Sequence, residues 1–349
     1  MLVREWNKQA VKRIQADFQR SADTHLLKLD IPGYADIDFY LKDESRHPTG
    51  SLKHRLARSL FLYALCNGRI TEKTPVIEAS SGSTAVSEAY FARLIGVEFY
   101  AVMPRSTSQQ KISLIERFGG KCHLVDCATA MHDAAQQLAT AKSGVFMDQF
   151  KYAERATDWR GNNNIAESIF SQMQAEPHPI PYAVVMSAGT GGTSATIGRY
   201  IRYQGYDTQL WVVDPENSAF YPGFMNGDPD YATGVSSRIE GIGRPNVEAS
   251  FVPGVIDDML QVPDVASVAA MRWLHDYTGH MAGPSTGTNL WGLLMVADQM
   301  RQHGHRGSLV TLMCDAGERY IDTYYDDHWV AENIGDIATP SKQLREWLV

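Results

Sequence analysis

The sequence has no apolar run long enough to span a membrane, which takes about 20 consecutive residues. It also has no concentrated basic face, and its net charge of -8 argues against a nucleic-acid-binding protein. Low-complexity tracts and internal repeats are absent as well. We therefore expect neither a membrane nor a nucleic acid as a partner.

Cysteine is scarce, and the four cysteines are Cys66, Cys122, Cys127 and Cys314. No two of them form a CxxC pair, so a reduced, cytoplasmic chain is the simplest interpretation. The stretch "CHLVDC", residues 122–127, could be argued as a metal cluster, but it lacks the short double spacing of a zinc site. We predict an alternating strand there and no metal.

Short apolar strands alternate with helical segments, which is typical of an α/β protein with parallel sheets. The predicted strands are residues 74–80, 98–104, 121–127, 182–188, 209–215 and 308–315. At the N-terminus, Trp6, Ala10, Ile14 and Phe18 recur at helical spacing and predict an amphipathic helix rather than a secretory signal. A chain of 349 residues suffices for two domains or lobes, and the turn-rich stretches 160–164 and 175–182 are candidate junctions.

The stretch "HPTGSLKHR", residues 47–55, places a lysine at the start of a predicted helix. Pro48 and Gly50 break the preceding segment, and Ser51 is a suitable N-cap. Lys53 would lie beside the unsatisfied N–H groups of a first turn, which favour its neutral, nucleophilic amine. Such an amine can form a Schiff base. Taken alone, the stretch is explained more simply by an ordinary exposed lysine.

A hydroxyl-rich loop follows the strand predicted at 74–80. Its residues are Ser80, Ser81, Gly82, Ser83 and Thr84, and a helix is predicted directly after it. Hydroxyl groups and a helix N-terminus together form a seat for a carboxylate or phosphate. The loop does not have the G-x-S-x-G pattern of a hydrolase nucleophile, and an ordinary helix cap remains the alternative.

A glycine-rich loop, "GTGGT" at residues 189–193, joins another predicted strand to a helix. Its backbone N–H groups would surround an oxyanion, although it lacks the lysine of a Walker loop. It also approaches the dinucleotide fingerprint, with Ser194 in place of a third glycine and Asp214 where a ribose-binding acid belongs. An NAD-dependent oxidoreductase is therefore an alternative, but it would leave Lys53 and the serine loop unexplained.

Six motifs follow one another along the chain: Lys53 in "HPTGSLKHR", "SSGSTA" at 80–85, Gln149 in "DQF", "GTGGT" at 189–193, "EGIG" at 240–243 and "DAGERY" at 315–320. From Leu27 to Asp326 the chain resembles the cysteine synthase and cystathionine β-synthase family, the fold-type II pyridoxal phosphate enzymes. It is most similar to the bacterial L-cysteine desulfhydrase branch. The resemblance implies two lobes, each with a mainly parallel twisted sheet flanked by helices. Residues 1–45 and 159–349 would form a larger cofactor-binding lobe, and residues 46–158 a smaller mobile lobe.

The resemblance also implies a role for each motif. Lys53 would bind the cofactor, pyridoxal 5'-phosphate, as a Schiff base and move the substrate's α-proton. The phosphate would be held by Gly189, Thr190, Gly191, Gly192 and Thr193, and the substrate carboxylate by Ser80, Ser81, Thr84 and Gln149. Ser83 stands where the synthases carry an asparagine that touches the cofactor's 3′ oxygen. Residues 241–244, beginning with Gly241, would face the substrate side chain, and residues 283–288 would line the cofactor's other flank.

The last motif departs from the family. Ala316 stands where the synthases place a serine against the pyridine nitrogen, so the adjacent Asp315 is the candidate for that contact, with a purely local role as the alternative.

We expect elimination from L-cysteine to hydrogen sulfide, pyruvate and ammonia by a homodimer, with the N-terminal helix as a candidate interface element. The alternatives are cysteine synthase activity, from O-acetylserine plus sulfide, and another β-replacement like that of cystathionine β-synthase.

Overall fold

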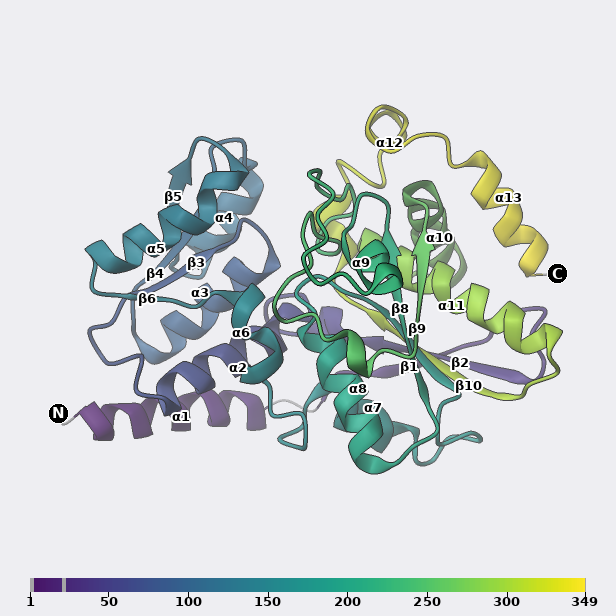
Figure 1. Cartoon of the computed structure of the whole chain (residues 1–349), viewed down its shortest axis with the longest axis horizontal. Coiled ribbons are helices and arrows are strands. Elements are labelled where there is room, and N and C mark those ends of the chain that lie inside the picture. Colours follow the sequence, from purple (N-terminus) through teal and green to yellow (C-terminus); the bar gives the residue numbers. More distant parts are fainter. Residues whose placement is uncertain (1–2, 21–22, 349) are drawn as a thin grey trace. The chain divides into compact units, whose positions relative to one another are not determined.

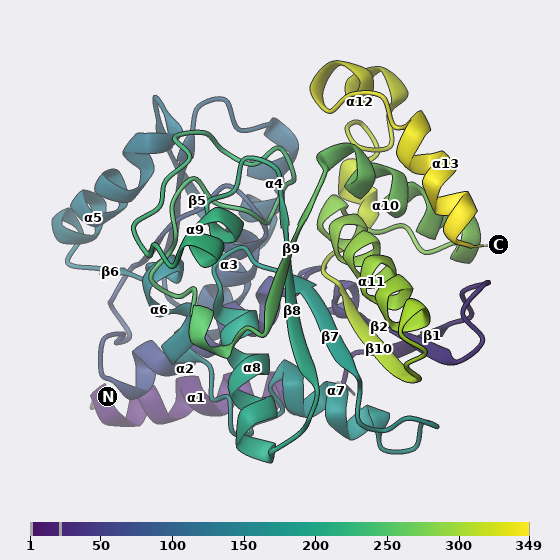
Figure 2. The same cartoon turned by 45° about the vertical axis from the view of Figure 1, so that its right-hand side comes forward.

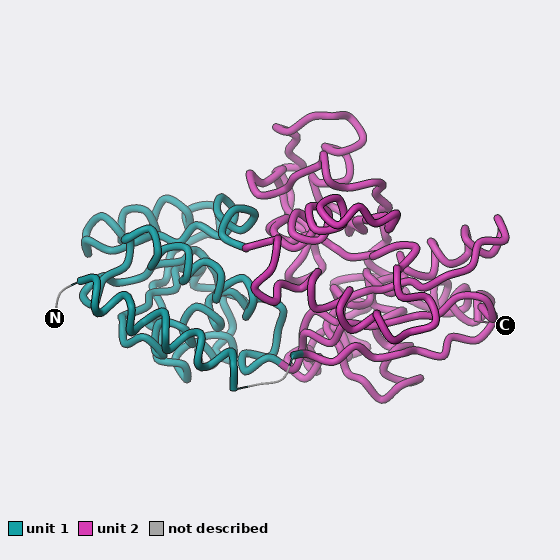
Figure 3. Tube along the Cα trace, turned by 90° about the horizontal axis from the view of Figure 1, so that it is seen from below, with its two compact units in different colours: residues 1–23, 47–157 teal, residues 24–46, 158–349 magenta. Residues whose placement is uncertain are grey.

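The structure is a computed structural model that describes residues 3–20 and 23–348. It divides into two compact units, which Figure 3 distinguishes by colour. Unit 1 comprises Met1–Asp23 and His47–Thr157, and unit 2 comprises Thr24–Arg46 and Asp158–Val349. Each unit contains one sheet, so the expected α/β fold with two mainly parallel sheets is confirmed.

Unit 1 contains a four-stranded parallel sheet in the order β5-β4-β3-β6 (Figure 1). The strands are β3 (Val76–Ala79), β4 (Phe99–Pro104), β5 (Lys121–Val125) and β6 (Val145–Phe146). The helices are α1 (Val3–Gln19), α2 (Lys53–Cys66), α3 (Ser83–Ile95), α4 (Gln109–Arg117), α5 (Met131–Ala141) and α6 (Gln149–Ala156). All four residues of β3 are buried, as expected for a strand in the interior of a parallel sheet.

The N-terminal helix α1 belongs to unit 1. Trp6, Ala10 and Ile14 form its buried stripe, which joins the same hydrophobic cluster as residues of α2 and α3. The expected division placed residues 1–45 in the larger lobe, whereas the structure assigns only 24–46 of the N-terminal part to unit 2. The apolar stripe explains the difference, because it is buried within unit 1.

Unit 2 contains a six-stranded sheet in the order β1-β2-β10-β7-β8-β9, in which only β1 is antiparallel. The strands are β1 (Leu26–Leu29), β2 (Ile37–Asp43), β7 (Ala183–Ser187), β8 (Gln209–Pro215), β9 (Asp258–Val262) and β10 (Gly307–Met313). The helices are α7 (Ile165–Met173), α8 (Gly192–Gln204), α9 (Phe220–Asn226), α10 (Asp264–Thr278), α11 (Pro284–Gln302), α12 (Asp327–Asn333) and α13 (Ala338–Trp347). Helix α11 runs beside α10 and packs on the sheet, where Gly292 allows a close approach to Val213 (Figure 2).

All six predicted strands are present, and β1, β2, β6 and β9 were not predicted. The two candidate junctions, residues 160–164 and 175–182, both lie inside unit 2, and the first begins two residues after the unit boundary at Asp158. The described residues also form four short 3-10 helices: η1 (Glu44–Arg46), η2 (Ala128–Ala130), η3 (Pro253–Val255) and η4 (Gly317–Tyr320). Across the described ranges, no helix is both long and apolar enough to cross a membrane.

Candidate active site

Lys53 is the first residue of α2, at the helix N-terminus that the sequence predicted. Ser51 does not cap the helix, because the N-cap position is occupied by Leu52, which makes no side-chain cap hydrogen bond. The turn is tight instead: the N–H groups of His54 and Arg55 donate to the carbonyl oxygens of Ser51 and Leu52, each at 3.1 Å. The Ser51 hydroxyl is buried and has no hydrogen-bond partner within the described part of the chain.

The residue after Lys53 is fixed in an aromatic environment. The His54 ring stacks on His47 at 5.0 Å between ring centroids and contacts Tyr90 and Phe91. Its Nδ1 lies 3.2 Å from the Thr49 hydroxyl. These contacts hold the backbone beside Lys53 in one place, as a residue with a positioned amine requires.

The predicted carboxylate seat is assembled at the carboxyl end of β3. Thr84, in the first turn of α3, donates from Oγ1 to Oε1 of Gln149 over 2.8 Å. Gln149 begins α6, and both side chains are buried. Ser80 is buried and accepts from Gly82 N at 3.3 Å, while Ser81 and Ser83 are half-buried. Unit 1 therefore brings together the residues for which the sequence predicts carboxylate binding.

The glycine loop connects β7 to α8 in unit 2. Gly191 has a φ of 86°, and a Cβ on it would lie 2.5 Å from Phe251 Cα and 2.6 Å from the carbonyl oxygen of Ser250. The Thr190 hydroxyl accepts from Gly192 N at 3.2 Å and is buried. Helix α8 begins at Gly192, so the first N–H groups of this helix have no acceptor within it. The loop fits an oxyanion at a helix N-terminus.

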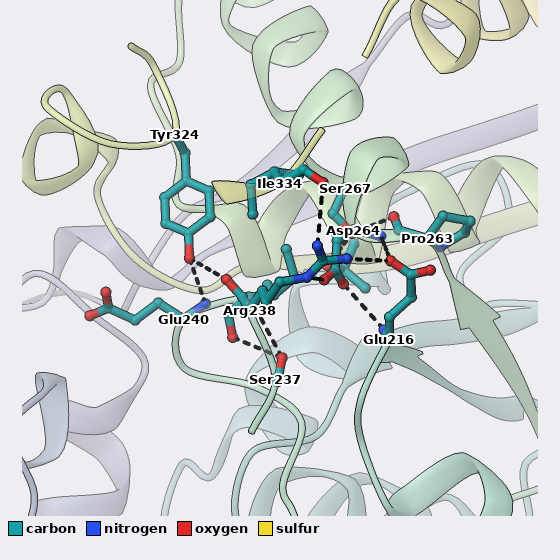
Figure 4. A network of polar contacts seen from close by, with 11 residues as sticks. Glu216, Ser237, Arg238, Glu240, Pro263, Asp264, Ser267, Tyr324 and Ile334 are labelled. Atoms are coloured by element: carbon teal, nitrogen blue, oxygen red, sulfur yellow. Dashed lines mark hydrogen bonds and ion pairs between the residues drawn. The ribbon is translucent and has the colours of Figure 1, made fainter. Parts of the chain in front are cut away.

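The segment 240–243 lies beside this loop. Gly243 N donates to the carbonyl oxygen of Ala188 over 2.9 Å. Figure 4 shows how Arg238 anchors the segment: its guanidinium donates to Asp264 at 2.8 Å and to Glu216 at 2.9 Å. The Tyr324 hydroxyl donates to the Arg238 carbonyl oxygen and accepts from Glu240 N. Burial raises the pKa of Asp264 to about 6, although the hydrogen bond from Arg238 and its positive charge lower that pKa.

Asp315 follows β10 and is buried. Its Oδ2 accepts from the Tyr320 hydroxyl at 2.5 Å, and its carbonyl oxygen accepts from Gly283 N at 3.2 Å. A Cβ on Gly283 would lie 2.0 Å from Asp315 Oδ1, so only glycine leaves room for this carboxylate. Asp315 is thus held in a defined position at the start of α11, and a local pairing with Tyr320 is part of that arrangement.

Asp214 does not suit the dinucleotide alternative. It is fully buried in β8, and its Oδ2 accepts from Tyr221 N at 2.8 Å. Burial raises the pKa of this carboxyl group to about 7. A ribose hydroxyl cannot reach a side chain that is buried and bonded in this way.

No three His, Cys, Asp or Glu side chains within the described ranges are grouped to hold a metal ion. No disulfide joins any two of the four cysteines, which all lie in the described ranges. Residues 122–125 of "CHLVDC" lie in the strand β5, where the sequence predicted a strand.

The sequence did not predict one buried residue, Asn289, that holds two strand ends of the site in place. Asn289 of α11 accepts from Ser187 N at 2.7 Å and donates to the carbonyl oxygen of Leu312 at 2.9 Å. It thereby ties the end of β7 to the end of β10. A single asparagine within the apolar run of α11 is the signal that could have identified it.

The model of the family described as pyridoxal-phosphate dependent enzyme matches residues 19–315. The chain belongs to this family. The match overturns the NAD-dependent alternative, and it makes pyridoxal phosphate the cofactor.

Among relatives of this pyridoxal-phosphate dependent enzyme, an L-cysteine desulfhydrase of Mycobacterium tuberculosis is 57% identical, covering 99% of this chain and 95% of its own. A cysteine synthase of Aquifex aeolicus is 29% identical, covering 84% of this chain and 85% of its own. A crystal structure of a hydrogen sulfide-producing enzyme from Fusobacterium nucleatum has a TM-score of 0.80 at 24% identity, covering 95% of this chain and 96% of that one. This structural likeness supports the fold.

The residues present in the pyridoxal-phosphate dependent enzyme fit its cofactor. The Ser187 hydroxyl is buried at the end of β7, two residues before the glycine loop, and no described residue forms a hydrogen bond with it. Buried hydroxyl groups are normally paired, so an unpaired one at this edge of the sheet suits a bound polar group. The loop at Gly191 and the start of α8 fit an anionic group such as a phosphate, and Lys53 has its amine at a helix start in unit 1.

Proposed function

We propose that this chain is a cysteine desulfhydrase: L-cysteine and water yield hydrogen sulfide, pyruvate and ammonia. The observation that carries the proposal is the 57% identity, over 99% of the chain, to a protein of that activity. The reaction breaks the bond between Cβ and sulfur, and sulfide leaves with the electron pair. Release of ammonia from Cα then completes the conversion to pyruvate.

Each predicted site residue has its own role in the proposed reaction. Lys53 holds the cofactor covalently and removes the proton from Cα, while the cofactor, when bound, withdraws electrons from that carbon. The substrate carboxylate is bound by Ser80, Ser81, Thr84 and Gln149, and the cofactor phosphate by Gly189, Thr190, Gly191, Gly192 and Thr193. Ser83 would lie at the cofactor's 3′ oxygen, with a weaker or altered contact than an asparagine makes, and Asp315 would meet the ring nitrogen and keep the ring electron-withdrawing. Gly241 and its neighbours face the substrate side chain.

Orientation is this chain's own contribution to the rate. One anion seat binds the carboxylate and another binds the phosphate, so the α-proton is presented to a single amine. The bonds of Thr84 to Gln149 and of Gly243 to Ala188 keep these seats rigid. We also propose that unit 1 is the smaller, mobile lobe, that unit 2 is the larger cofactor-binding lobe, and that the protein is a cytoplasmic homodimer.

The second candidate function is cysteine synthase activity, which the 29% identical synthase favours. The purified holoenzyme, given L-cysteine alone and then O-acetylserine plus sulfide, distinguishes the two. We expect sulfide and pyruvate to form in equal amounts from L-cysteine. A kcat/KM far higher for O-acetylserine plus sulfide would assign the chain as a synthase. Light scattering of the same preparation gives the oligomeric state.

A further inference from the structure

Two glutamates lie side by side in the interior of unit 1. Glu78 is on β3, Glu88 is on α3, and both side chains are 0% exposed. Glu78 is well bonded: Oε1 accepts from Ala79 N at 2.8 Å, and Oε2 accepts from Gln149 N at 3.2 Å. Apart from Glu78, no described residue offers a hydrogen bond to either oxygen of Glu88.

The burial of the two carboxyl groups favours retention of a proton. Burial raises the pKa of both groups, and Glu78 raises the pKa of Glu88 further through its charge and its hydrogen bond. The nearby Asp148 raises the pKa of Glu78, whereas the hydrogen bond with Glu88 lowers it. Two buried carboxylates with no donor between them would repel one another. A protonated Glu88 resolves this, because its hydroxyl becomes a donor to Glu78. Glu78 then has three donors directed at it and is fixed in place.

The hydrogen bonds of Glu78 hold the backbone beside both parts of the predicted carboxylate seat, the serine loop and Gln149. Ala79, whose N–H it binds, directly precedes Ser80. Gln149, whose N–H it also binds, accepts from Thr84. One carboxyl group therefore sets the position of the serine loop and of the first residue of α6, which are 69 residues apart in the sequence (149 minus 80).

We propose that Glu78 and Glu88 form a positioning pair, in which the protonated Glu88 donates a hydrogen bond to Glu78, and Glu78 aligns the serine loop and Gln149 for the substrate carboxylate. This inference rests on the proposed function. Neither glutamate touches the substrate. Their effect reaches it through Ser80, Thr84 and Gln149.

Three variants test the pair in the holoenzyme. Glu88→Gln keeps a donor toward Glu78, whereas Glu88→Ala removes it. Glu78→Gln replaces one carboxylate oxygen with an amide NH2, which cannot accept from the backbone N–H of Ala79 or Gln149 that faces it. Asp214→Asn is the matched control, because it changes an equally buried acid in unit 2. The measurements are KM and kcat for L-cysteine, and the cofactor absorbance on titration with L-alanine, an amino acid that has the carboxylate but no leaving group.

We expect Glu88→Ala and Glu78→Gln to raise KM, and to weaken L-alanine binding, by about tenfold, with kcat changed less than about threefold. Glu88→Gln should behave like the wild type. If Glu88→Ala retains the wild-type KM, or if Glu88→Gln is as impaired as Glu88→Ala, the pair does not position the seat. If one glutamate variant does not fold, the KM values of the remaining glutamate variants test the pair. A wild-type enzyme that binds L-alanine but makes no sulfide would contradict the proposed function alone.

Discussion

Thr84 and Gln149 are joined by a 2.8 Å hydrogen bond between Oγ1 and Oε1, although 65 residues separate them in the sequence. The bond connects the first turn of α3 to the first residue of α6, and both side chains are buried. It uses the oxygen of the Gln149 amide and leaves the amide NH2 as the group that can donate to an incoming carboxylate.

Replacing Thr84 with valine keeps the shape of the side chain and removes the donor. The Gln149 oxygen then loses its partner, and the amide is free to rotate. We expect KM for L-cysteine to rise by about tenfold, with a smaller change in kcat. Thr84→Ser retains the hydroxyl and should stay near the wild-type values. Steady-state kinetics of both variants measures this, and equal KM values for all three proteins would contradict the role of the bond.

Replacing Lys53 with alanine should abolish covalent attachment of the cofactor and nearly all turnover, because no other amine is proposed to move the α-proton. The wild-type protein should be yellow, and borohydride should fix the colour to the peptide containing Lys53, as read by mass spectrometry. Lys73→Ala, an exposed lysine of the same unit, is the control. A colourless wild-type protein in the presence of pyridoxal phosphate would contradict the assignment.

Gly191→Ala should reduce cofactor affinity by at least about tenfold. The new Cβ would lie 2.5 Å from Phe251 Cα, and backbone cannot yield cheaply to relieve such a contact. Gly205→Ala is the matched control on the same helix, since its φ is also positive but nothing lies within 4 Å of the Cβ position. It should cost about 1–2 kcal/mol of stability and leave binding unchanged. Titration of the apoprotein with pyridoxal phosphate compares the two, and equal affinities would count against the phosphate seat.

Asp315→Asn should lower turnover and shift the absorbance of the bound cofactor, because an amide cannot keep the ring nitrogen protonated. Tyr320→Phe removes the donor to Asp315 Oδ2 but leaves the carboxylate, so its spectrum should change less. Absorbance and kinetics of both holoenzymes measure the difference. An unchanged spectrum and turnover in Asp315→Asn would mean that this residue only pairs locally with Tyr320.

Asp214 should make stability depend on pH. Its pKa of about 7 in the folded protein is above the value near 3.9 of an unfolded aspartate, so the folded state binds more protons between these values. Stability is therefore highest below pH 4 with respect to this group and falls as the pH rises toward 7. Asp214→Asn should gain roughly 3 kcal/mol relative to the wild type between pH 5 and pH 8. Urea unfolding at both pH values measures this, with the exposed Asp207→Asn as control.

The sequence predicted the elements whose signal is local. The strands β7, β8 and β10 are runs of apolar residues followed by turns, and periodicity identifies such runs directly. The strand β2 was not predicted because three of the seven residues in "IDFYLKD" are charged, yet one of these, Lys42, is fully buried. Its ammonium group donates to the carbonyl oxygen of Thr24 and to Gln172, which is 130 residues away. No local pattern reports a partner at that distance.

The site residues, too, were predicted where the signal is local and not where it depends on distant partners. The glycine and serine loops were found because each is a contiguous motif at a strand end, and the resemblance supplied their roles. The pairings of Glu78 with Gln149 and of Asn289 with Ser187 were not predicted. Each joins separate elements of one unit, so it depends on how those elements pack.

The pairing of β2 with β10 imposes an order on how the chain can fold during its synthesis. Ile37 is opposite Gly307, and Asp43 is opposite Met313, so this edge of β2 stays open until the ribosome has passed residue 313. Unit 1 needs nothing beyond Thr157. A nascent chain of intermediate length therefore carries a finished unit 1 and an unpaired strand that offers its hydrogen-bonding edge to other chains. Chaperones that shield such edges would act on this protein late in translation, on β2 and its neighbours.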